Sequence, residues 1–180
     1  MAKFMDALTD GLIKFIGEQH IFFTATAPTD GRINLSPKGM DTFRCLSPTR
    51  VGYLDLTGSG NETSAHLLDN GRMTIMFCSF SEKPLILRLY GHGRTIRPDD
   101  ADWAEYLGHF HALPGQRQIT VMDIGSVQTS CGFAVPEFTL KSVRPKLIEW
   151  AESEGEEKLC GYRAKGNVTS IDGLPTGYRL

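Results

Sequence analysis

Two stretches decide the fold of this chain: RINLSPKG at residues 32–39 and TGSGNETSAHL at residues 57–67. Each holds a cluster of small polar residues at the end of an apolar, β-branched run. Val51–Leu56 is such a run, and we expect a strand that the following glycines terminate. Asn61–Asn70 then predicts a short helix, with Asn61 at its N-cap position.

The start of this helix is suited to binding a phosphate group. A glycine-bearing loop before a helix exposes unpaired backbone N–H groups at the positive end of the helix dipole. The hydroxyls of Thr63 and Ser64 and the ammonium group of Lys38 would complete such a site. The structural alternative is that the glycines form a tight turn and Asn61 only caps the helix. The pattern is neither a dinucleotide fingerprint, because the third glycine is missing, nor a Walker loop.

Working outward, short strands outnumber helices. The expected strands are Ile21–Ala27, Arg32–Ser36, Val51–Leu56, Met73–Phe80, Leu85–Ile96 and Gln118–Val127, with Cys131–Val135 also extended. The expected helices are 3–18, 61–70, 99–110 and 145–153, and residues from about 155 to 180 are expected to form an irregular tail. This pattern favours a β-barrel over a layered βαβ sheet. The length of 180 residues suits a single domain spanning 1–180.

The composition excludes several classes of protein. The chain has 19 basic and 21 acidic residues and a formal net charge of −2, which gives no general attraction to nucleic acid or to anionic membranes. No apolar run approaches the ~20 residues of a membrane-spanning helix. Asp6 and Asp10 interrupt any signal-peptide core, so we expect a cytoplasmic protein. The four cysteines are expected as free thiols, and no metal site is expected from the histidine spacing.

Further motifs follow the two opening stretches: NGRMTIMF at 70–77, LRLYGHG at 87–93, SCGFAVP at 130–136 and SIDGLP at 170–175. In this order and spacing, the chain resembles the pyridoxamine-phosphate-oxidase-like family of FMN-binding split barrels. The resemblance implies a mainly β (α+β) fold, a six-stranded split β-barrel of Greek-key type with a few peripheral helices. It also implies FMN as the cofactor and a homodimer with FMN at the subunit interface.

The resemblance also implies roles for individual residues. The strand 32–38 would line the edge of the flavin ring, with hydrogen bonds from Asn34 and Ser36 and with Lys38 reaching the phosphate. Tyr53 and Asp55 match the strand that passes beside the ribityl chain. The implied cofactor-binding residues are Arg32, Ile33, Asn34, Leu35, Ser36, Lys38, Tyr53, Asp55, Asn61, Thr63 and Ser64.

Two departures from the family pattern bear on activity. Thr63 and Ser64 stand where the oxidase itself has an Arg-Lys pair, and residues 173–180 lack its arginine-bearing C-terminal motif. We therefore expect FMN binding without pyridoxamine-phosphate oxidation. The first hypothesis is an FMN-dependent oxidoreductase that acts on a small substrate, with NADH or NADPH as a candidate electron donor. The second is a flavin-binding sensor, storage or stress protein without turnover, and a third replaces FMN by a deazaflavin or haem. No catalytic residue is predicted, because a bound flavin would carry the chemistry.

Overall fold

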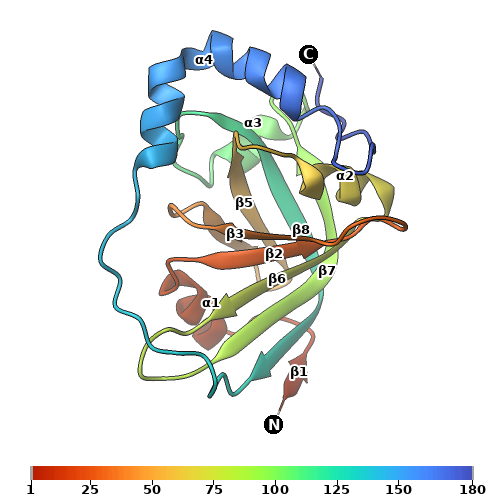
Figure 1. Ribbon diagram of the computed structural model, residues 1–180. Coiled ribbons are helices and arrows are strands. Elements are labelled where there is room, and N and C mark those ends of the chain that lie inside the picture. Colours follow the sequence, from red (N-terminus) through yellow and green to blue (C-terminus); the bar gives the residue numbers. More distant parts are fainter. Residues whose placement is uncertain (1, 180) are drawn as a thin grey trace.

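The computed structural model describes residues 2–179, which form one sheet of eight strands with four helices around it (Figure 1). The sheet order is β3-β2-β6-β7-β8-β5-β4, every pair is antiparallel, and β1 pairs with β8 off this path. The strands are β1 (Lys3–Met5), β2 (Phe22–Thr26), β3 (Asn34–Lys38), β4 (Phe43–Ser47), β5 (Arg50–Leu56), β6 (Arg72–Cys78), β7 (Ile86–Ile96) and β8 (Gln116–Ser130). The helices are α1 (Asp10–Gly17), α2 (Glu62–Asp69), α3 (Trp103–Leu107) and α4 (Lys146–Gly166).

The sheet curls into a split β-barrel around a core of aromatic rings. The longest strand, β8, has 15 residues and pairs with β1, β5 and β7 along its length. Inside the barrel, the ring centroid of Phe43 on β4 lies 5.0 Å from that of Phe22 on β2 and 5.0 Å from that of Phe77 on β6. These edge-to-face contacts join opposite ends of the sheet across the core.

The pairing of β7 with β8 contains a register shift between Tyr90 and Gly91. The backbone of β8 comes so close here that a Cβ atom added to Gly91 would lie 2.0 Å from the carbonyl oxygen of Asp123. Only glycine fits this position. The irregularity increases the local twist, which helps the two long strands to bend around the core.

The helices cover the barrel at separate places. The Oγ1 atom of Thr9 accepts a hydrogen bond from the Leu12 N–H at 3.3 Å and so caps α1, which packs Ile16 into the main core. The inner face of α2 packs against β2, β6 and β7 and buries His66 and Leu67. α3 belongs to a second apolar cluster, on the other side of the sheet. Within residues 2–179, no helix has the length and apolar character needed to cross a membrane.

The predicted fold class, a mainly β split barrel with a few helices, is confirmed, although the details differ. The structure has eight strands where six were expected. Residues 3–5 pair with β8 instead of beginning the first helix, and β4 is absent from the prediction. Residues 131–135, expected to be extended, contain a turn and pair with no other strand of the described chain.

The irregular tail predicted from residue 155 is wrong over residues 155–166, where α4 continues. Gly155 has a φ of 72°, so the helix bends at that residue and then resumes (Figure 1). Beyond α4, residues 168–176 form what we call the C-terminal hairpin, with a β-bridge between Thr169 and Pro175, and it lies against α2 (Figure 1). We call residues 131–145 the strap, because they run outside the barrel from β8 to α4 (Figure 1).

Candidate cofactor site

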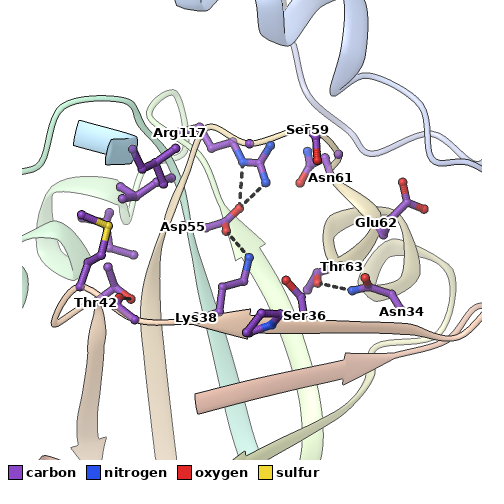
Figure 2. Close-up of a pocket in the computed structure, with 18 residues that line it drawn as sticks. Asn34, Ser36, Lys38, Thr42, Asp55, Ser59, Asn61, Glu62, Thr63 and Arg117 are labelled. Atoms are coloured by element: carbon purple, nitrogen blue, oxygen red, sulfur yellow. Dashed lines mark hydrogen bonds and ion pairs between the residues drawn. The ribbon is translucent and has the colours of Figure 1, made fainter. Parts of the chain in front are cut away.

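A cavity of about 340 Å³ opens between β3, β5, the 57–61 loop and the start of α2 (Figure 2). Its volume falls within the range of small-molecule sites in proteins, about 300–1,000 Å³. The two sequence stretches that decide the fold supply most of its wall. Six of the eleven residues predicted to bind cofactor line it: Asn34, Ser36, Lys38, Asp55, Asn61 and Thr63.

The alternation of side chains along β3 decides which of its residues reach the cavity. Successive side chains of a strand point to opposite faces. Asn34, Ser36 and Lys38 line the cavity, as Figure 2 shows. Ile33, just before the strand, and Leu35 point away and are 78% and 65% exposed. The predicted role of β3 as one wall of a site therefore holds for Asn34, Ser36 and Lys38, with Pro37 beside them, but not for Leu35.

Arg32 and Tyr53 do not line the cavity. Arg32 lies before β3, and its backbone N–H and guanidinium group both bond to the carboxylate of Asp172 near the C-terminal hairpin turn. Tyr53 lies two residues before Asp55 on β5, which places its ring deeper in the barrel, against Phe22. The ammonium nitrogen of Lys38, which does line the cavity, lies 5.7 Å from the Tyr53 ring centroid.

Asp55 is the centre of a buried ion-pair network in the cavity wall (Figure 2). One carboxylate oxygen lies 3.1 Å from the Lys38 Nζ atom, and the other lies 2.8 Å from the guanidinium group of Arg117. Burial alone would raise the pKa of Asp55, but the attraction of Arg117 and then of Lys38 outweighs it and holds that pKa well below its ordinary value. Burial lowers the pKa of Lys38, and Asp55 more than compensates, so that pKa lies above its ordinary value.

Arg117 and Gln118, at the start of β8, are site residues that the sequence interpretation missed. The Gln118 side-chain amide donates hydrogen bonds to Asp55 at 2.8 Å and to the side-chain oxygen of Asn61 at 2.7 Å. Arg117 also donates to the side-chain oxygen of Asn167 at 2.6 Å. The sequence offered one signal, the polar pair Arg117 and Gln118 at the start of an otherwise apolar strand. A buried arginine is uncommon without a partner, so an arginine in this position indicates an acidic partner nearby.

Asn61 occupies the N-cap position of α2, but its side chain does not cap the helix. Its amide instead accepts from Gln118 and donates to the carbonyl oxygen of Asn167 at 3.2 Å. The first N–H groups of a helix have no partner within the helix. Because the Asn61 side chain takes none of them, they stay available at the edge of the cavity.

Thr63 and Ser64 point in different directions, since neighbouring residues of a helix lie about 100° apart around its axis. The Thr63 hydroxyl accepts a hydrogen bond from the Asn34 amide at 3.1 Å at the cavity wall (Figure 2). Ser64 is fully buried on the other side, where it donates to the Thr176 carbonyl oxygen at 2.8 Å and accepts from Arg97 at 3.1 Å. Ser64 therefore fastens the C-terminal hairpin to α2.

The cavity offers hydrogen-bonding groups and compensated charges rather than a reactive side chain. Lys38 and Arg117 share the charge of Asp55, and the carboxylate of Glu62 accepts from the Ile171 N–H at 3.1 Å. No cysteine or histidine is among the lining residues, and residues 2–179 hold no cluster of three or more potential metal ligands. The arrangement can hold a polar ligand and orient it.

Comparison with known proteins identifies the family. The sequence model described as pyridoxamine 5'-phosphate oxidase matches residues 8–131, more than half of the chain. The chain belongs to the pyridoxamine 5'-phosphate oxidase family. It is also 41% identical over 195 aligned residues to the pyridoxamine 5'-phosphate oxidase family protein ustO of Aspergillus flavus, covering 97% of this chain and 78% of ustO.

Two solved structures share the fold. A variant of HupZ from Group A Streptococcus superposes with a TM-score of 0.54 at 18% identity, over 68% of this chain and 98% of that one. A pyridoxamine 5'-phosphate oxidase-related, FMN binding protein of Nostoc punctiforme gives a TM-score of 0.50 at 14% identity. The superposition covers 67% of this chain and 82% of the Nostoc protein. At these identities the comparisons establish the shared architecture.

Proposed function

We propose that the cavity binds FMN and that the protein is an FMN-dependent oxidoreductase acting on a small substrate. The observation that carries this proposal is the convergence of Asn34, Ser36 and Lys38 on one face of β3 opposite the start of α2. This brings polar groups for a heterocyclic ring and donors for a phosphate group to one space. The description of the Nostoc relative as FMN binding agrees with it.

The loop and helix start fit a phosphate group. Gly58 and Gly60 line the cavity, and a Cβ atom at Gly58 would meet nothing nearer than the Leu56 carbonyl oxygen at 3.9 Å, so the loop backbone is open to a ligand. The free N–H groups of α2 and the Lys38 ammonium group would hold the phosphate. The Thr63 hydroxyl would add one hydrogen bond where the oxidase has a charged side chain.

The lining favours a flavin over haem. Met40 is the one residue of a haem-ligating type among the lining residues, which include no histidine, cysteine or tyrosine. Asn34 and Ser36 instead offer hydrogen bonds to the edge of a polar ring. FMN, when bound, supplies hydride or electron transfer, and the protein supplies position and charge. Lys38 and Arg117 would favour negative charge that develops nearby.

Absorbance and titration test the cofactor. Purified protein, or protein to which FMN has been added, should show flavin absorbance bands after gel filtration. Lys38→Ala should weaken FMN affinity by tenfold or more, because a charge-assisted hydrogen bond is worth about 1.5–3 kcal/mol. Lys141→Ala, on the exposed strap, is the matched control and should leave affinity unchanged. A colourless protein that takes up haem or a deazaflavin but no FMN would overturn the proposal.

Turnover separates an enzyme from a flavin-binding protein. Under anaerobic conditions, NADH or NADPH should reduce the bound flavin, and a panel of acceptors should reoxidise it. A flavin that stays oxidised with both donors, and passes electrons to no acceptor once reduced chemically, would favour the non-catalytic alternative of a sensor, storage or stress protein.

We also propose a homodimer with the cofactor at its interface. β3 forms one edge of the sheet, beside the cavity. Leu35 on this strand and Ile33 just before it are both largely exposed. An exposed apolar sheet edge is a surface that a soluble protein usually covers. Light scattering after gel filtration should give about twice the chain mass of 19.9 kDa. Leu35→Lys should shift the protein to monomer, whereas a wild-type monomer would contradict the proposal.

A further inference from the structure

A second and larger cavity, of about 1,080 Å³, lies between the strap and the end of the barrel. It is formed on one side by residues 18–21 and 37–40 and on the other by the strap residues Phe138, Leu140 and 142–144. Residues 37–40 and Leu147 line both this cavity and the cofactor cavity. A molecule in the second cavity would therefore lie beside Lys38, at the mouth of the first.

The wall that the strap contributes is apolar and uncovered. Phe138, Leu140 and Val143 line the cavity, and the first and last of these are 67% and 54% exposed. The strap is fixed at Phe138, whose backbone N–H donates to the Phe80 carbonyl oxygen at 2.9 Å and whose ring lies 5.5 Å from the Phe80 ring. The apolar wall thus has a defined position against the barrel.

The charged groups around this cavity are mainly cations. Lys38, Arg144 and Lys146 line it, against the single carboxylate of Glu18. Lys38 is paired with Asp55, which Arg117 also contacts, whereas Arg144 makes no ion pair within residues 2–179 and Lys146 reaches Glu149 only at 3.9 Å. Two cations beside an apolar wall form a surface complementary to an organic anion.

We propose that the second cavity binds an organic anion with an aromatic or similarly apolar body, and that this is the chemical class of the substrate. Arg144 and Lys146 hold its anionic group, and Phe138 and Val143 pack against its body. The binding site itself depends on the strap, the start of α4 and the barrel end. Its role as substrate site rests on the proposed function, because it requires a flavin in the adjoining cavity.

A pair of fluorescent probes tests the class of ligand. Anilinonaphthalene sulfonate is an anion with an apolar aromatic body, and phenylnaphthylamine has the same rings without the charge. The wild-type full chain should bind the sulfonate saturably and more tightly than the neutral probe. The double variant Arg144→Gln/Lys146→Gln should raise the Kd of the sulfonate about tenfold, since each exposed charge contributes up to about 1 kcal/mol. It should leave the Kd of the neutral probe unchanged.

Two further variants complete the design. Lys141→Gln removes a strap cation that does not line the cavity and should bind both probes like wild type. Val143→Asp should weaken both probes, because it places a carboxylate in the apolar wall. Equal sulfonate affinity in Lys141→Gln and in the double variant, or binding that never saturates, would overturn the proposal. A sulfonate affinity that falls as protein concentration rises would overturn it too, because a second copy of the chain would then fill the cavity.

FMN titration of the same samples separates this proposal from the first. If the protein takes up no FMN but still binds the sulfonate more tightly than the neutral probe, the FMN proposal and the substrate role are refuted and the anion site stands. Normal FMN uptake without probe discrimination would refute the anion site alone. When both ligands bind, the sulfonate should shift the absorbance bands of FMN, and an unchanged flavin spectrum would refute its placement beside the cofactor.

Discussion

Replacing Asp55 by asparagine should destabilise the protein strongly while leaving its shape almost unchanged. The substitution removes the charge that lies 3.1 Å from Lys38 and 2.8 Å from Arg117. Removing one partner of a buried ion pair costs about 3–5 kcal/mol, because the remaining charge is left without compensation. Here two cations are left and Arg117 is almost fully buried, so we expect about 4–5 kcal/mol.

Urea unfolding, followed by tryptophan fluorescence, measures this loss. With a slope of about 2 kcal/mol per molar, the midpoint at pH 7 should fall by roughly 2 M. Because the pKa of Asp55 is lowered in the folded state, its contribution is complete above about pH 5 and is lost as the pH falls through the folded-state pKa. The gap between wild type and Asp55→Asn should therefore shrink in acid. A loss below about 1 kcal/mol at pH 7, or a gap that widens in acid, would refute the reasoning.

Three further substitutions separate the roles of neighbouring groups. Ser64→Ala should leave FMN affinity unchanged but lower the free energy of unfolding by about 1–3 kcal/mol, since buried Arg97 loses a hydrogen-bond acceptor. A weaker FMN affinity, measured by titration, would show that Ser64 does contribute to cofactor binding. Gly91→Ala should lower the free energy of unfolding by more than about 3 kcal/mol or prevent folding, because the new Cβ atom meets the Asp123 carbonyl oxygen. A melting temperature close to that of wild type would disprove the close approach of β8 to Gly91. Gly155→Ala should cost about 1–3 kcal/mol, because its φ of 72° and ψ of 162° lie in a backbone region that is essentially restricted to glycine, although a Cβ atom there meets nothing within 4 Å. A loss above about 3 kcal/mol in calorimetry would contradict this backbone-only penalty.

Local patterns predicted much of the fold and part of the lining of the candidate cavity. The barrel class follows from several short β-branched strands, and the wall formed by β3 follows from the RINLSPKG stretch. The period of two along a strand could have separated Asn34 and Ser36 from Leu35, had it been applied to the site residues. The helical period could likewise have separated Thr63 from Ser64.

The remaining site residues depend on long-range pairing that local patterns do not encode. Arg117 reaches Asp55 because β5 and β8 are antiparallel neighbours in one particular register, which pairs Asp55 with Gln118. Asn167 lies more than a hundred residues from Asn61 and joins the site only through the path of α4 after its bend. A glycine at residue 155 gave no indication that the helix would resume beyond it.

The hydrogen bonds of the C-terminal hairpin set an order of events in biosynthesis. Arg97 and Ser64 bond to Thr176, and Arg117 and Asn61 bond to Asn167, so the frame around the cavity depends on a segment translated after every strand of the sheet. A nascent chain can pair all its strands before it can complete the hydrogen bonds around the cavity. If the cavity binds a cofactor as proposed, we expect tight retention only after residues 167–176 have left the ribosome, and a pause in translation before that point should leave a formed barrel that releases the cofactor easily.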